Sequence, residues 1–181
     1  MTLKSGTGEK AAQTTSPFHA GEQAVQARFG VRDKIEAIGR RIIHSEMPKQ
    51  HRVFFAQIPF VVMGVKDADG QPWATLLSGQ PGFITASTPT CLEVGALPAI
   101  ADPTRSGLSV DRPVALLGIE LHSRRRNRAN GRVIATSEGG FSVAIDQSFG
   151  NCPQYIQARR FDVVTPGSAA PPPAIERGRG L

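Results

Sequence analysis

A cluster of arginines is the most conspicuous source of binding chemistry in this sequence. Arg124, Arg125, Arg126, Arg128 and Arg132 fall within residues 124–132. Guanidinium groups bind phosphate and carboxylate through paired N–H donors, so this cluster indicates contact with an anionic cofactor or partner. The whole chain has the same bias, with 21 Lys and Arg against 15 Asp and Glu and a formal net charge of +6. Solvated charges on an edge strand, which deter edge-to-edge aggregation, explain the cluster equally well.

Nucleic acid is the less favoured anionic partner. Binding of single strands uses aromatic side chains on which bases stack. No aromatic residue lies between Leu121 and Ile134, where the arginines are concentrated. The sequence therefore argues against a nucleic-acid interface at this cluster.

Other kinds of catalytic chemistry are poorly represented. The histidines show neither HExxH nor any other metal-ligand spacing, and the two cysteines form no CxxC pair, so no metal site is expected. The chain has no Ser-His-Asp arrangement, P-loop or GxGxxG motif. No catalytic residue is named, and the sequence leaves open whether the protein is an enzyme. The histidines and cysteines considered as metal ligands or catalytic groups are His19, His44, His51, His122, Cys91 and Cys152.

Length and composition indicate one folded domain between two tails. A chain of 181 residues is long enough for a single core. Residues 1–15 are polar and predict a flexible tail, and residues 165–181 are rich in Pro and Gly and predict a second one. The domain is expected at 16–164. No apolar run approaches the roughly 20 residues of a membrane helix, so a cytoplasmic protein without membrane contact is expected.

The segments that must position these groups begin with two helices. Ser16 followed by Pro17 predicts the capped start of the first helix. Ile35, Ile38 and Ile42 repeat at helical spacing and predict a second helix, which Pro48 ends.

A series of short strands follows from residue 53. β-rich runs predict strands at 53–57, 60–66, 73–78, 83–87, 92–94, 113–122, 124–129, 132–136 and 141–147. Turn residues at 67–70 and the pair Asn130-Gly131 predict hairpins. Short strands joined by tight turns, without helices between them, favour an antiparallel barrel with the two helices at its flank.

Four segments together resemble a known family. They read SPFHAGE at 16–22, WATLLSGQPGF at 73–83, RRRNRANGR at 124–132 and FGNCPQYIQ at 149–157. In this order and spacing they are similar to the pyridoxamine 5′-phosphate oxidase-like, FMN-binding split-barrel proteins. The resemblance covers about residues 16–160 and implies a mainly β, antiparallel split barrel. Longer members continue into a second barrel-like unit, and this chain corresponds to the first unit only.

The resemblance implies a flavin site. FMN is the expected cofactor, with FAD or a deazaflavin as alternatives. In the strand 73–78, alternation places Thr75 and Leu77 on one face and Leu76 and Ser78 on the other. Thr75 and Ser78 serve equally well as plain strand residues, and segment 151–155 serves equally well as a rigid turn. The expected cofactor-binding residues are Thr75, Leu76, Leu77, Ser78, Gly79, Gly82, Arg126, Arg128, Asn151, Gln154 and Tyr155.

Two functions follow as hypotheses. The first is a flavin-dependent, oxidoreductase-like protein that acts on a small redox substrate, with a homodimer supplying the wall that the second unit provides in longer members. The second is a truncated, non-catalytic split-barrel module for binding or dimerisation. It is favoured by the absence of Arg and Lys from the strand 73–78, where pyridoxamine phosphate oxidases carry them.

Overall fold

The structure, a computed structural model, describes residues 15–162. The tails predicted for 1–15 and 165–181 fall almost wholly outside these residues, so the domain bounds of 16–164 stay a prediction. The helices are α1 (Ala20–Arg28), α2 (Arg32–Ile42) and α3 (Lys49–Gln57), with a short 3₁₀ helix η1 (Pro103–Gly107). The strands are β1 (Phe60–Lys66), β2 (Pro72–Ser78), β3 (Ile84–Thr88), β4 (Cys91–Val94), β5 (Pro113–Glu120), β6 (Arg125–Thr136) and β7 (Phe141–Asn151).

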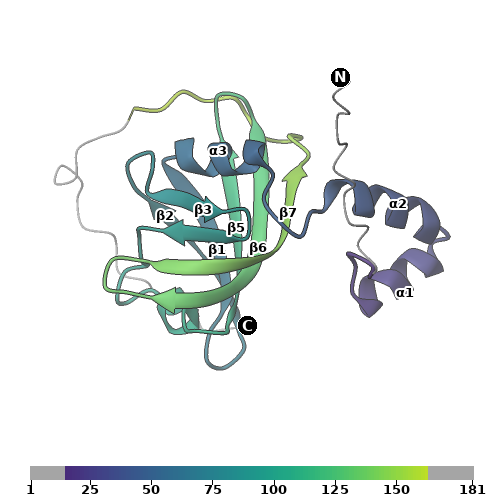
Figure 1. The fold of residues 1–181 in the computed structure, drawn as a ribbon, viewed down its shortest axis with the longest axis horizontal. Helices are drawn as coiled ribbons and strands as arrows, with labels where there is room; N and C mark the ends of the chain where they lie inside the picture. The colour runs from purple at the N-terminus through teal and green to yellow at the C-terminus, as the bar shows by residue number, and fades with distance from the viewer. Residues whose placement is uncertain (1–14, 163–181) are drawn as a thin grey trace, which may run out of the picture.

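The strands form one antiparallel sheet that curls without closing (Figure 1). Its order is β2-β1-β5-β6-β7-β4-β3, and every neighbouring pair is antiparallel. The two edge strands, β2 and β3, do not pair with each other. These observations confirm the predicted fold, a mainly β, antiparallel split barrel with helices at its N-terminal side. No helix within residues 15–162 is long and apolar enough to cross a membrane.

The core fills the concave side of the sheet, and α3 lies across one end of it (Figure 1). Alternate residues of β1 and β5 point inward and are buried, among them Met63 and Leu116. Phe54 and Phe55 of α3 are fully buried, with their rings 5.5 Å apart and edge to face. Gly118 of β5 makes room for this helix, because a Cβ there would lie 2.6 Å from the Phe54 ring.

The strand predicted at 53–57 is wrong, since these residues belong to α3. The run Val-Phe-Phe-Ala is typical of a strand because it is β-branched and aromatic. Pro48 instead stands at the N-cap position of a helix whose two phenylalanines fill the mouth of the curled sheet. Tertiary packing therefore overrides local propensity here.

The hairpin predicted at Asn130-Gly131 is also wrong. Both residues lie inside β6, which runs unbroken from Arg125 to Thr136. The turn between β5 and β6 falls at residues 121–124, where Arg124 adopts a left-handed φ of 62°. Gly131 is in the strand because a Cβ would lie 1.9 Å from the Ala144 carbonyl oxygen, so the neighbouring strand leaves no room for a side chain.

A β-bulge in β7 changes which side chains face outward. Asn130 pairs with Gln147 and Gly131 pairs with Ile145, so Asp146 is the extra residue. Before the bulge Ile145 points into the core, and after it Ser148 does. Asp146 and Gln147 consequently both lie on the outer side of the sheet.

Helices α1 and α2 form an N-terminal arm that stands away from the barrel (Figure 1). The first helix begins later than predicted: His19, not Ser16, is its N-cap and forms a capping box with Glu22. Ser16 instead donates a 2.7 Å hydrogen bond to Glu36 of α2. Two connections tie the arm to the barrel: a backbone bridge between His44 and Ser148, and a hydrogen bond from Gln147 to the Pro17 carbonyl.

Candidate functional site

The outer face of the sheet carries side chains in three parallel rows of different chemistry. The register aligns the rows across β2, β1, β5, β6 and β7, and neighbouring rows are about 7 Å apart because same-face residues alternate along a strand. The cationic row consists of Pro72, Lys66, Pro113 and Arg132. The middle row consists of Ala74, Gly64, Ala115, Asn130 and Gln147. The apolar row consists of Leu76, Val62, Leu117, Arg128 and Phe149.

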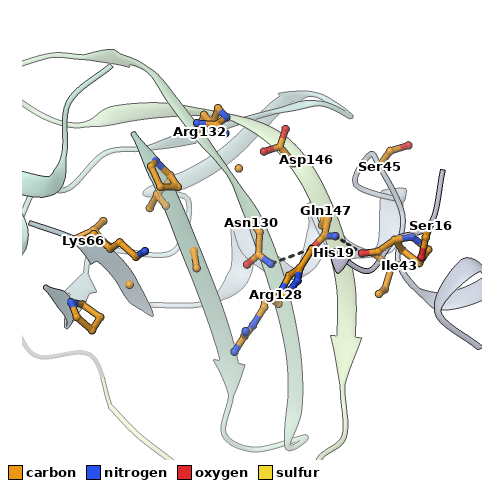
Figure 2. A pocket seen from close by; sticks show the side chains of 18 of the residues that line it. Ser16, His19, Ile43, Ser45, Lys66, Arg128, Asn130, Arg132, Asp146 and Gln147 are labelled. Carbon is orange, nitrogen blue, oxygen red and sulfur yellow. Dashed lines mark hydrogen bonds between the residues drawn. The ribbon is translucent and has the colours of Figure 1, made fainter. Parts of the chain in front are cut away.

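A groove of about 1160 Å³ lies over the cationic row and most of the middle row, between the sheet and the start of the arm (Figure 2). Of the apolar row only Arg128 lines it. Its floor is low in the middle row, where Gly64 and Ala115 have almost no side chain. A Cβ placed on Gly64 would be 3.9–4.0 Å from its nearest neighbours, so the space above this residue is open. The remaining groove lining comes from both sides: Thr15, Ser16, Pro17, His19, Ile43, Ser45, Val65, Lys66, Pro72, Trp73, Pro113, Val114, Arg128, Asn130, Gly131, Arg132, Asp146 and Gln147.

The charges around the groove favour an anion. Lys66 lines it from β1 and Arg128 and Arg132 from β6, against the single carboxylate of Asp146 among the described lining residues. Arg132 is held in place by a 3.1 Å hydrogen bond from its Nη1 to the Asp111 carbonyl, which leaves its other N–H groups available. Long cationic side chains around a floor of small residues are suited to a flat or extended anionic ligand.

Trp73 stands at the rim of the groove, where its indole is anchored. Its Nε1 donates a 2.8 Å hydrogen bond to the Asp67 carboxylate. This bond, together with backbone N–H donors of the turn, holds the pKa of Asp67 below its usual range. The ring is 40% exposed, but Trp73 pairs with the buried Val65, so its side chain leaves β2 on the side opposite the outer face, and its backbone carbonyl borders the groove beside Gly64.

Four buried polar atoms on the outer face lack hydrogen-bond partners. They are Arg126 Nε, Arg128 Nε, Asn130 Oδ1 and Asn151 Oδ1, and they lie together on β6 and the end of β7. An unpaired buried donor or acceptor costs about 1–3 kcal/mol, so natural proteins seldom leave several side by side. This cluster is what a face that binds a polar ligand would show, and it is compatible with a phosphorylated, hydroxylated aromatic such as FMN.

The predicted residues of β2 divide between the two faces of the sheet. Leu77 is buried in the core, and Thr75 donates a 2.6 Å hydrogen bond to Asp102, which in turn caps η1. Leu76 and Ser78 lie on the outer face, and Leu76 is 58% exposed. Only these last two share a face with the arginines.

The predicted glycines shape the turn after β2. A Cβ on Gly79 would lie 2.6 Å from the Phe83 ring. Gly82 has a φ of +96° and donates a 2.8 Å backbone hydrogen bond to Ala56 of α3. Both therefore have a structural reason to be glycine.

The predicted residues of β6 and the segment after β7 meet at one end of the outer face. Arg126 pairs with Asn151 across the strands and donates a hydrogen bond to the Cys152 carbonyl. Gln154 accepts a weak hydrogen bond from the Cys152 thiol, and Tyr155 is 97% exposed with a φ of +71°. Arg128 alone of the predicted set lines the groove.

The sequence did not single out several residues that line the groove. Lys66, Asn130, Asp146 and Gln147 come from β1, β6 and β7. Alternation along 60–66 places Lys66 on the face opposite to the buried valines, and this pattern could have identified Lys66 from the sequence. The bulge at Asp146, which sets the direction of Gln147, leaves no such signal in the sequence.

Comparisons with known proteins show a likeness of fold alone. No protein-family model matches the chain, and no curated protein matches its sequence. A solved structure of a proposed pyridoxamine 5′-phosphate oxidase from Lactobacillus delbrueckii is similar to 59% of this chain and 95% of its own, with 18% identity and a TM-score of 0.45. HupZ of Group A Streptococcus is similar to 63% of this chain and 100% of its own, with 10% identity and a TM-score of 0.46. A histidine-to-alanine variant of HupZ matches at 7% identity and a TM-score of 0.45, over 58% of this chain and 99% of its own. Likenesses this distant carry no argument about what the groove binds, so the function is argued from the groove itself.

Proposed function

We propose that this protein binds FMN in the groove on the outer face of its sheet. One observation supports this above all: the order of the three rows. The cationic row, the middle row with its small residues and two amides, and the apolar row follow one another in the same order as the phosphate, the polyol chain and the aromatic ring of FMN.

The cationic row would hold the phosphate. Lys66 supplies a point charge and Arg132 a planar set of donors, and both line the groove. Hydrogen bonds from charged donors contribute about 1.5–3 kcal/mol each. The phosphate therefore supplies a large share of the affinity in this proposal.

The apolar row would support the ring. Leu76, Val62 and Leu117 lie next to the groove on the same outer face of the sheet, and Arg128, which lines the groove, is paired with Leu117 across β5 and β6. Arg126 and Asn151 lie one row further along with unpaired polar atoms that could meet the ring edge. Thr75 and Leu77 take no part, because they point to the other side of the sheet.

The reaction class proposed is oxidoreduction of a small molecule in the cytoplasm. Bound flavin supplies the hydride chemistry, and the protein's own task is to bind the flavin, orient it and exclude water. FAD or a deazaflavin would use the same cationic row.

A homodimer accompanies this proposal. The apolar row leaves Leu76 exposed, and the arm exposes Phe29 to 74% and Val25 to 57%. A second copy laid over the outer face of the sheet would cover Leu76 and wall the groove. A sizing measurement that returns a monomer, with and without FMN, would contradict the dimer.

Titration of the purified full chain with FMN and with riboflavin, followed by flavin fluorescence, tests the proposal. The natural protein is expected to bind FMN at least tenfold more tightly than riboflavin, because only FMN carries the phosphate. The double variant Lys66→Gln, Arg132→Gln is expected to bind both ligands alike. Arg28→Gln, which removes an exposed cation of α1 outside the groove, is the control for loss of a surface charge and should keep the preference.

The outcomes separate the two functional hypotheses. Failure of the natural protein to bind any flavin refutes the proposed function. A colourless dimer would then support the non-catalytic dimerisation module, which the exposed apolar row favours. An unchanged preference for FMN in the double variant would instead refute the placement of the phosphate at the cationic row.

A further inference from the structure

Two amides of the middle row and the backbone carbonyl of Pro17 form a hydrogen-bond chain with a fixed direction (Figure 2). The chain begins at the Pro17 carbonyl, which can only accept. Gln147 Nε2 donates to it at 2.9 Å, so Gln147 Oε1 must face the other way. Asn130 Nδ2 donates to that oxygen at 3.4 Å, which leaves Asn130 Oδ1 as the free end. The orientation of both amides follows from the carbonyl and not from a choice between equivalent rotamers.

The bulge in β7 makes this chain possible. If β7 alternated regularly through Asp146, Asp146 would point outward and Gln147 would point into the core, as Ile145 and Ser148 do. With the bulge, the amide of Gln147 lies between Asn130 and the first residues of the arm. The bulge thus positions Gln147 to hold the Asn130 amide, and Asn130 Oδ1 points away from Gln147 on the groove side of β6.

That acceptor has no partner. Asn130 Oδ1 is buried and makes no hydrogen bond, although Asn130 lines the groove. It stands in the middle row, one row from Arg132 and one row from Arg128. A ligand group reaches it after a rotamer change of a neighbouring long side chain, which is a fast motion at a protein surface.

We infer that Asn130 is a specificity-determining residue, whose Oδ1 accepts a hydrogen bond from a hydroxyl of the chain that links the phosphate to the ring. This inference rests on the proposed function and extends it. The groove would select aromatic ligands that carry a polyol chain over those that carry the ring alone. Gln147 is a positioning residue, since it acts by holding the Asn130 amide and not by touching the ligand.

The test compares riboflavin with lumiflavin, which has the same ring system and a methyl group in place of the polyol chain. Neither ligand carries a phosphate, so the cationic row does not enter the comparison. The natural protein is expected to prefer riboflavin about tenfold or more, because a buried acceptor gains its missing donor. Asn130→Leu, of similar size but without polar atoms, should lose that preference while its affinity for lumiflavin changes by less than about twofold.

Two further variants separate positioning from folding. Asn130→Asp keeps an acceptor but cannot donate to Gln147 Oε1, so it should keep part of the preference for riboflavin, which Asn130→Leu loses. Gln147→Leu removes the bond that orients Asn130 and should lower the preference without abolishing it. Circular dichroism and thermal melting establish that each variant is folded.

The results distinguish this inference from the proposed function. If FMN binds and Asn130→Leu still prefers riboflavin tenfold, the inference is refuted and the flavin proposal stands. If Gln147→Leu behaves as the natural protein does, the positioning role of Gln147 is refuted. If the natural protein binds no flavin at all, both the proposed function and this inference are refuted.

Discussion

Gly64 offers a way to fill the groove without disturbing the fold. It lies in the middle of β1, with its missing side chain directed to the outer face. A Cβ there meets only the Trp73 carbonyl oxygen at 3.9 Å and Ala115 Cβ at 4.0 Å, both ordinary contact distances. The substitution Gly64→Val would therefore put a branched side chain on the groove floor at no cost in packing.

The stability and the affinity are expected to move in opposite directions. Glycine inside a strand costs about 0.5–1 kcal/mol, and β-branched residues favour strands, so the variant should be more stable by up to about 1 kcal/mol. For a chain of this size such a gain raises Tm by about 2–4 °C. A ligand lifted from the floor loses at least one charge-assisted hydrogen bond, worth about 1.5–3 kcal/mol, so FMN affinity should fall at least tenfold.

Ala74→Val is the matched control. Ala74 is the direct partner of Gly64 on β2 and is exposed on the same face, but it does not line the groove. Thermal melting and FMN titration of the two variants are run side by side. If the Gly64→Val variant is folded and binds FMN as tightly as the natural protein does, FMN binds outside this groove.

Three further predictions concern the framework of the barrel. Burial raises the pKa of Asp102, but hydrogen bonds from Thr75 and Thr104 outweigh this effect and hold the pKa below its usual range. Asp102→Ala should therefore lower the free energy of unfolding by about 2 kcal/mol in denaturant titration. An unchanged free energy would contradict the role given to these bonds. Burial first, and then the charges of His44 and Arg125, hold the pKa of His51 below 6.5. The unfolded chain therefore binds a proton more readily than the folded chain, and the free energy of unfolding should fall as the pH drops below about 6.5. His51→Gln should flatten this dependence between pH 5 and 7. Gly118→Ala places a Cβ 2.6 Å from the Phe54 ring and should cost about 1–3 kcal/mol, and a melting temperature equal to that of the natural protein would contradict the tight approach of α3.

Much of the sheet could be predicted because its strands alternate. The runs 60–66, 73–78 and 141–147 were placed within β1, β2 and β7, and 113–122 covers β5. The second helix was found from its isoleucine spacing. Local patterns failed where distant groups decide the conformation, as in α3, whose phenylalanines plug the curled sheet, and at Asn130-Gly131, whose turn signal is overridden by pairing with β5 and β7.

The candidate groove was less accessible to sequence reasoning. Arg128 was selected for its charge, and it does line the groove. The alternation of 73–78 correctly separated Leu76 from Thr75, but it did not say which face would lie outward. That choice depends on strand order and on the curvature of the whole sheet, neither of which local periodicity contains.

The extra residue in β7 gives the strand two opposite alternations. Up to Ile145 the odd-numbered side chains of β7 point inward, whereas from Gln147 onward the odd-numbered ones point outward. Loss of Asp146 would remove the bulge and leave a regularly alternating strand, in which Ser148 still points inward and Phe149 outward, so the backbone bridge to the arm would be kept. Loss or gain of a residue elsewhere in β7 would instead exchange inside for outside along the rest of the strand, so Asp146 is the place where this strand tolerates a change of length.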